Sequence, residues 1–139
     1  PPCTATPTTP VQSGCPALSL PSAKPSGLVK SATTAQDYDR NADAVIGPTT
    51  EFKSNSIVHA VVAVQNAPAN TIVKSKWYAN DIGKAAPCNT LIDEPELTLD
   101  TGGSGNLDFK QGPILPIGTY RVEVYVNGAL DRIMSFTIK

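Results

Sequence analysis

The segment "PIGTYRVEVYVNG", residues Pro116 to Gly128, is the most informative about the fold because it joins a turn, a strict alternation and a second turn. From Tyr120 to Val126, every second side chain is apolar, which is the pattern of a strand with one buried face. Asn127-Gly128 is the pair that best tolerates the positive φ angles of a type I′ hairpin. The next segment, 130–139, alternates again, and the two segments together predict a β-hairpin.

The same period of two recurs through the rest of the chain after residue 27. We expect the segment 35–56 to be a long polar loop and 101–106 to be a glycine-rich turn. No segment has a period of 3.6, so the sequence predicts little or no helix and an all-β sandwich or barrel. The further expected strands are "LVKSATT" (28–34), "IVHAVVAVQ" (57–65), "TIVKSKWYAN" (71–80), "ELTLD" (96–100) and "LDF" (107–109).

Two details resemble immunoglobulin domains. "GTYRV", residues 118–122, resembles the tyrosine corner at the start of strand F, and Trp77 resembles the core tryptophan of strand C. Val122 stands where antibody domains carry a bridging cysteine, so the inter-sheet disulfide is missing. The chain resembles the immunoglobulin-like modules of bacterial and archaeal secreted proteins. This resemblance implies an immunoglobulin-like antiparallel β-sandwich over residues 28–139, an architecture that hosts many unrelated roles.

Residues 1–27 differ in composition from the rest, because they hold seven of the chain's thirteen prolines. Proline fixes φ and removes a donor, so we expect an extended Pro/Thr-rich tail or linker that packs no core alone. Its longest proline-free apolar piece is Ala17, Leu18, Ser19 and Leu20. We expect this piece to add as a strand to the open sheet edge of a neighbouring copy.

The three cysteines, Cys3, Cys15 and Cys88, have no metal-binding spacing and allow at most one internal bridge. We favour Cys15–Cys88, which would fasten the tail to the sandwich. Cys3–Cys15 and three reduced thiols remain the alternatives. Cysteines together with a Pro/Thr-rich tail favour an extracellular or cell-surface protein.

Charge and hydropathy narrow the choice of partners. Charged residues make up 17% of the chain and the net charge is -1, which argues against nucleic acid and against a polybasic membrane patch. The longest apolar run, 57–64, has the length of a strand, so the sequence predicts no membrane span.

No constellation of residues predicts catalysis, a metal or another cofactor. His59, the only histidine, lies in the most apolar strand, and no serine or cysteine is placed to be its nucleophile. The acidic cluster of 92–100 fits a solvated face. Asp37, Asp39 and Asn41 have the spacing of a calcium loop, yet the loop lacks its usual glycine and final glutamate, and such residues commonly bond to their own backbone. Calcium binding at these three residues stays open.

Two classes of function remain, and neither is enzymatic. The first is a non-catalytic extracellular interaction module, whose partners are copies of itself joined into a surface filament by strand addition. The second is a carbohydrate-binding module. Strands C and F are neighbours in this fold, so Tyr78 and Tyr125, both expected on the outer face, would form an aromatic platform for sugar rings.

Overall fold

The computed structural model describes residues 15–17 and 19–139. Its strands are short to medium in length, and its only helix among the described residues is one 3₁₀ turn, η1 (Gly83–Ala85). In chain order the strands are β1 (Val29–Asp39), β2 (Ala44–Pro48), β3 (Glu51–Phe52), β4 (Val58–Ala67), β5 (Thr71–Asp81), β6 (Thr90–Asp93), β7 (Glu96–Leu99), β8 (Gly103–Gln111), β9 (Gly118–Val126) and β10 (Ala129–Ile138).

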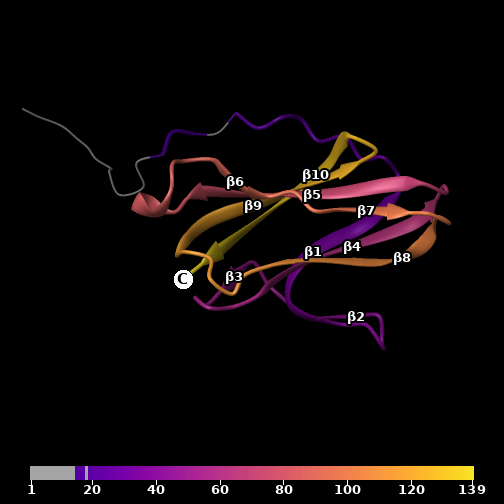
Figure 1. Ribbon diagram of the computed structural model, residues 1–139, viewed down its shortest axis with the longest axis horizontal. Coiled ribbons are helices and arrows are strands. Elements are labelled where there is room, and N and C mark those ends of the chain that lie inside the picture. Colours follow the sequence, from indigo (N-terminus) through magenta and orange to yellow (C-terminus); the bar gives the residue numbers. More distant parts are fainter. Residues whose placement is uncertain (1–14, 18) are drawn as a thin grey trace, which may run out of the picture.

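Two stacked sheets form a sandwich, which confirms the predicted all-β fold (Figure 1). The four-stranded sheet has the order β2-β1-β4-β8. The six-stranded sheet has the order β3-β10-β9-β5-β6, and β7 pairs with β5 beside β6. All pairings are antiparallel except the short one between β3 and β10. The hairpin predicted from the opening stretch is β9–β10, which turns at Asn127 and Gly128, both with positive φ.

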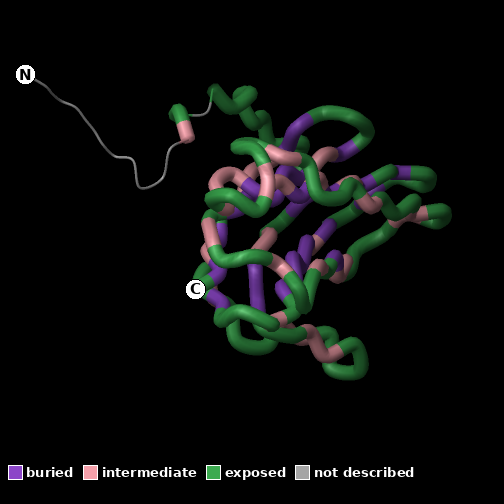
Figure 2. The backbone as a smooth tube through the Cα atoms, turned by 60° about the vertical axis from the view of Figure 1, so that its left-hand side comes forward, coloured by how far each residue is buried: buried purple, intermediate pink, exposed green. Residues whose placement is uncertain are grey.

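The core lies between the sheets, where Figure 2 shows the buried positions gathered. Trp77 is fully buried, and its Nε1 donates a hydrogen bond of 2.9 Å to the Ser75 hydroxyl. The Phe136 ring stacks on Tyr120 at 5.0 Å and meets Trp77 edge to face at 5.9 Å. The Tyr120 hydroxyl donates back to the carbonyl oxygen of Pro116. These contacts give the sandwich an aromatic centre, and aliphatic side chains fill the space around it.

Two expected connections are partly strand. The segment 35–56, expected as a loop, contains the end of β1 and all of β2 and β3. Its polar residues form a hairpin, because Asp43 accepts the positive φ that the turn requires. The expected turn 101–106 ends early, and β8 begins at Gly103 and pairs with β4. Backbone ladder bonds need no side chain, so the glycines do not prevent pairing here.

In the described part of the chain, no helix has the length and apolar composition that crossing a membrane requires.

Candidate interaction surface

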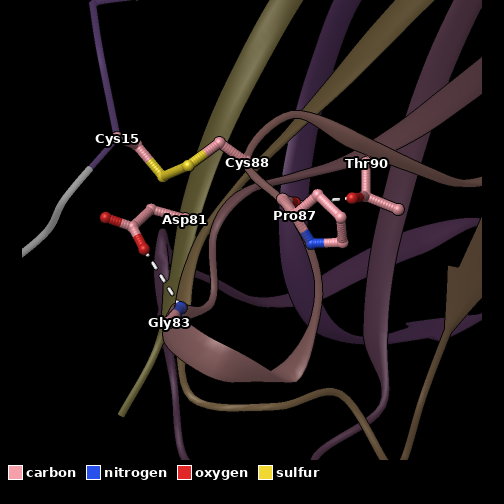
Figure 3. The surroundings of a disulfide bond; sticks show 6 residues. All are labelled: Cys15, Asp81, Gly83, Pro87, Cys88 and Thr90. Carbon is pink, nitrogen blue, oxygen red and sulfur yellow. Dashed lines mark hydrogen bonds between the residues drawn. A yellow bond between two sulfur atoms is a disulfide. The ribbon is translucent and has the colours of Figure 1, made fainter.

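The predicted disulfide between Cys15 and Cys88 is present and ties the N-terminal segment to the loop that follows η1 (Figure 3). Its two Cα atoms are 5.7 Å apart, and 73 residues separate the cysteines in sequence. The loop around Cys88 is held by its own hydrogen bonds. The Asn89 N–H donates to the Asn80 carbonyl at 3.0 Å, and the Thr90 hydroxyl donates to the Pro87 carbonyl at 2.5 Å.

A second attachment fixes the other end of this segment to the start of β10. The Ser26 N–H and hydroxyl donate to one oxygen of Asp131, at 2.7 and 2.6 Å. Arg132 Nε donates to the other oxygen at 2.9 Å. Close by, the Lys24 N–H donates to the Leu130 carbonyl at 3.0 Å. Asp131 is only 1% exposed, so this carboxylate is a buried anchor and not a surface charge.

The hydrogen bonds to Asp131 outweigh the effect of its burial. Burial alone would raise the pKa of the Asp131 carboxyl, because it penalises the charged form. The Ser26 hydroxyl and N–H, and then Arg132, stabilise the carboxylate, and the net result is a lowered pKa. The anchor is therefore ionised at neutral pH, and its bonds to Ser26 are charge-assisted.

We call residues 15–17 and 19–26 the strap. Figure 1 shows the strap on the outer side of the six-stranded sheet, running from the η1 end towards the β9–β10 turn. From Pro16 to Pro25, every described residue is exposed, and none belongs to a strand. Of the four residues predicted to donate a strand, Ala17, Ser19 and Leu20 are exposed, and Leu18 lies outside the described residues. The described part of the predicted donor segment thus makes no ladder with its own domain.

The outer face of β9 carries a buried ion pair that sequence reasoning missed. Arg121 Nε donates to Glu123 at 2.7 Å, and their side chains are only 4% and 3% exposed. Arg121 also donates to Asn80 at 2.5 Å, and Glu123 accepts the Tyr125 hydroxyl at 2.7 Å. Alternation predicted an outer position for Tyr125, and the burial of the ion pair on that face was not predicted. The available signal was the pair of opposite charges two residues apart, which share one face of a strand beside tyrosines.

Tyr78 and Tyr125, the predicted sugar platform, belong to this same polar network. The Arg121 guanidinium lies 4.0 Å from the Tyr78 ring centre, and Lys76 Nζ lies 4.8 Å from that of Tyr125. One face of each ring thus contacts a cation. Burial, followed by its bond to Glu123, raises the pKa of Tyr125 to about 12, so its hydroxyl remains a donor.

A groove of about 400 Å³ opens beside Tyr125 at the β9–β10 turn. The Tyr78 side chain does not line it. Its lining combines an apolar floor with amide, ammonium and carboxylate groups, namely Ile72, Lys74, Lys76, Glu96, Tyr125, Asn127 and Gly128. The structure therefore places one of the two predicted platform tyrosines in a concave site.

His59 is a structural residue of the opposite sheet. It is 7% exposed, its Nδ1 lies 2.8 Å from Asp108, and its Nε2 lies 3.7 Å from Asp37. The β1–β2 hairpin extends below the four-stranded sheet in Figure 1, and Asn106 on β8 donates to Asp43 of its turn at 2.9 Å. The two contacts join this hairpin to the outer face of β4 and β8.

The residues with the spacing of a calcium loop lie in the same hairpin and make local hydrogen bonds. Asp39 accepts the backbone N–H groups of Asn41 and Ala42, at 2.9 and 3.2 Å. Asp37 accepts the Tyr38 N–H at 2.7 Å. The carboxylates thus bond to their own backbone, and the described residues contain no group of three His, Cys, Asp or Glu side chains fit to hold a metal.

One sheet margin is long and unprotected. β8 ends the four-stranded sheet, runs for nine residues without proline and pairs only with β4 among the described strands. The other margins are partly covered or interrupted. β3 pairs with the end of β10, the Lys24 N–H bonds to Leu130 near its start, β2 has five residues, and Pro95 separates β6 from β7. An unpaired edge of this kind is a template for another strand.

No protein-family model matches this sequence, and no curated protein matches it significantly. Among solved structures, the chain is similar to an immunoglobulin-like protein from Pseudomonas aeruginosa. The TM-score is 0.50 at 12% identity, over 81% of this chain and 94% of that one. A CARDB domain from Pyrococcus furiosus, solved with di-metal ions, gives 0.41 at 14% identity, again over 81% and 94%.

A β-glucosidase from Listeria innocua gives a TM-score of 0.46 at 14% identity. The match covers 65% of this chain but only 14% of the length of that enzyme. The likeness to the Pseudomonas protein supports the immunoglobulin-like form of the sandwich, and at 12% identity it extends to the fold alone.

Proposed function

We propose that this chain is a non-catalytic interaction module of an exported protein, which associates with copies of itself at a cell surface. The observation that carries the proposal is the strap, an exposed extended segment fastened at both ends to a folded domain. Disulfides persist in oxidising compartments, which supports an extracellular location. A domain gains no core from such a segment, so presentation to a partner is the role that best explains it.

The proposed contact is strand addition between the strap of one copy and β8 of the next. Ala17, Ser19 and Leu20 are exposed and make no backbone hydrogen bond among the described contacts, and Leu20 keeps 41% of its surface exposed. Main-chain ladder bonds would supply the affinity, and the side chain of Leu20 would supply packing. While Cys15 is bonded to Cys88 of its own copy, the attachments at Cys15 and Lys24 hold the donor close to its own domain, and the neighbour's edge would approach the six-stranded sheet. A head-to-tail contact of this type propagates into a filament.

Proline at Ser19 tests the ladder directly. Ser19→Pro removes a backbone N–H donor from the middle of the proposed added strand. Ser22→Pro is the control, because Ser22 also belongs to the strap but lies outside residues 17–20. We expect Ser19→Pro to abolish concentration-dependent association in sedimentation velocity and Ser22→Pro to retain it. Equal association of both variants and the unaltered protein would reject strand addition by residues 17–20.

The groove beside Tyr125 supports a second candidate function, carbohydrate binding. Sugar sites combine an aromatic surface with amide and charged groups that bond hydroxyls, and this groove offers Tyr125, Asn127 and Glu96. Tyr125→Ala should then abolish binding to a glycan array or to oligosaccharides in calorimetry. Tyr78→Ala is the matched control, because Tyr78 lies outside the groove and its loss should leave binding intact. No binding by the unaltered protein would reject this alternative.

A further inference from the structure

The two ends of the strap are held in different ways. Lys24 and Ser26 form a root, because they bond to the carbonyl of Leu130 and to the buried carboxylate of Asp131. The residues before the root, 15–17 and 19–23, form an arm. Among the described contacts, the arm has neither a backbone nor a side-chain hydrogen bond to the sandwich, and its attachment is the single disulfide to Cys88.

The receiving cysteine is accessible. Cys88 is exposed, and the hydrogen bonds of Asn89 and Thr90 shape its loop without any contribution from the arm. The site that receives Cys15 is thus built entirely by the sandwich. Once the bridge is reduced, the arm of any copy that reaches this loop meets the same Cys88 thiol in the same surroundings.

We propose that the arm exchanges between copies, so that Cys15 of one molecule forms its disulfide with Cys88 of a second. The root stays on its own domain during the exchange, and the arm pivots about it. This inference rests on the proposed self-association and deepens it, because it identifies the covalent link that would hold neighbouring copies together. Exchange of an identical segment costs little, since each bond lost within a copy is regained between copies.

The reach and the chemistry permit the exchange. An arm of about nine residues spans roughly 30 Å when extended, which is sufficient to cross to a docked neighbour. Each bridge forms when the two thiols lose two protons and two electrons to one oxidised glutathione, which is cleaved to two reduced glutathiones. A tether of this length gives an effective concentration on the order of mM within one copy, so bridges between copies compete at similar protein concentrations.

Isotope mixing distinguishes the two kinds of bridge. The protein carrying Cys3→Ser is prepared unlabelled and fully ¹⁵N-labelled, mixed in equal amounts, reduced with dithiothreitol and reoxidised with glutathione. Peptide mass spectrometry then counts Cys15–Cys88 pairs that join a light to a heavy peptide. We expect almost none at about 10 µM protein and up to about a quarter of all pairs at about 1 mM. Absence of mixed pairs at both concentrations would overturn the exchange.

Two controls separate this inference from the proposed function. A mixture that is never reduced should contain no mixed pairs, which excludes scrambling during digestion. Ser19→Pro in the same background should keep the mixed pairs, because exchange needs the arm's reach and not its ladder bonds. Association in sedimentation velocity without mixed pairs would reject exchange and leave strand addition intact. Mixed pairs with no effect of Ser19→Pro on association would support exchange and reject strand addition.

Discussion

At the scale of single residues, several polar side chains are buried and form hydrogen bonds that stabilise the fold. Asp131, Arg121 and Glu123 are each less than 5% exposed, and each has hydrogen-bonded partners of complementary charge or polarity. Within the described residues, no buried side-chain nitrogen or oxygen lacks a hydrogen-bond partner. Hydrogen bonds to nearby groups thus offset the desolvation cost of burying these side chains, as is usual for buried polar groups in folded proteins.

Asp131 should make the stability of the domain depend on pH in acid. Its folded-state pKa is lowered from 3.8, so its stabilising contribution is present above that value and is lost as pH falls through the folded value. We expect Asp131→Asn to be less stable than the unaltered protein at neutral pH, and the difference to narrow below pH 3.8. Urea unfolding of the two proteins at neutral pH and below pH 3.8 measures this difference in the free energy of unfolding. A difference that is independent of pH would contradict the ionised anchor.

Trp77 should be the residue whose truncation costs most. It is fully buried and contacts Phe136 and Ser75, so Trp77→Ala removes burial and leaves a cavity. The expected loss is about 3–5 kcal/mol in the free energy of unfolding. Lys76→Ala, one residue away on the opposite face, is the control and should change stability by less than about 1 kcal/mol. Similar losses for both variants would show that Trp77 is not central to the core.

Tyr120 allows a finer test, because removing its hydroxyl leaves the ring stacked on Phe136. Tyr120→Phe deletes the hydrogen bond to the Pro116 carbonyl and should cost about 1 kcal/mol. Tyr78→Phe is the matched control, since its hydroxyl has no hydrogen bond among the described residues and its removal should be nearly neutral. Chemical denaturation of the two variants measures their free energies of unfolding, and equal values would contradict a stabilising role for the Tyr120 hydroxyl.

At the scale of elements, the disulfide determines how the tail relates to the sandwich. Cys15–Cys88 closes a long loop, with a sequence separation of 73 residues, and in the chain-entropy model such a bridge stabilises by roughly 4 kcal/mol. Cys88→Ser should lower the free energy of unfolding by up to about that amount. Cys3→Ser leaves the bridge intact and should have no effect. Equal behaviour of the two variants would contradict the assigned pairing.

Sequence patterns predicted strands with a clear apolar pattern. They failed for strands whose residues are mostly exposed or rich in glycine. The alternation around Tyr120 and the Asn127-Gly128 turn predicted β9–β10, and the odd cysteine count allowed a single bridge, of which the favoured one, Cys15–Cys88, is present. β2 was missed because its residues are mostly exposed and carry little hydrophobic signal. The start of β8 was missed because glycines that pair through their backbone resemble a turn in the sequence.

The candidate site was predictable only in part for a related reason. Local spacing predicted Tyr78 and Tyr125 on an outer face, and the apolar pattern predicted residues 17–20 as the donor segment, which stays a prediction. The root at Asp131 depends on a bond between residues 105 positions apart, which no local pattern encodes. The bulge in β10 between Leu130 and Arg132 shifts the register there, so alternation does not give the position of Asp131 either.

At the scale of the whole molecule, the proposed function requires the sandwich to present its N-terminal segment to another copy. The proposed division at residues 27 and 28 would separate this segment from the folded domain. Lys24 and Ser26 nevertheless bond to β10, so a truncation that tests association should keep them. Removing residues 1–23 eliminates the arm and spares the root, and circular dichroism can verify that the sheet content is unchanged.

Sedimentation equilibrium of the full chain and of residues 24–139, over the same range of concentrations, measures whether the arm causes self-association. We expect the mean mass of the full chain to rise above its monomer value of 14.5 kDa as concentration increases, while the truncated chain stays monomeric. Association of the truncated chain to the same extent, or a full chain that stays monomeric up to about mM concentration, would contradict this expectation.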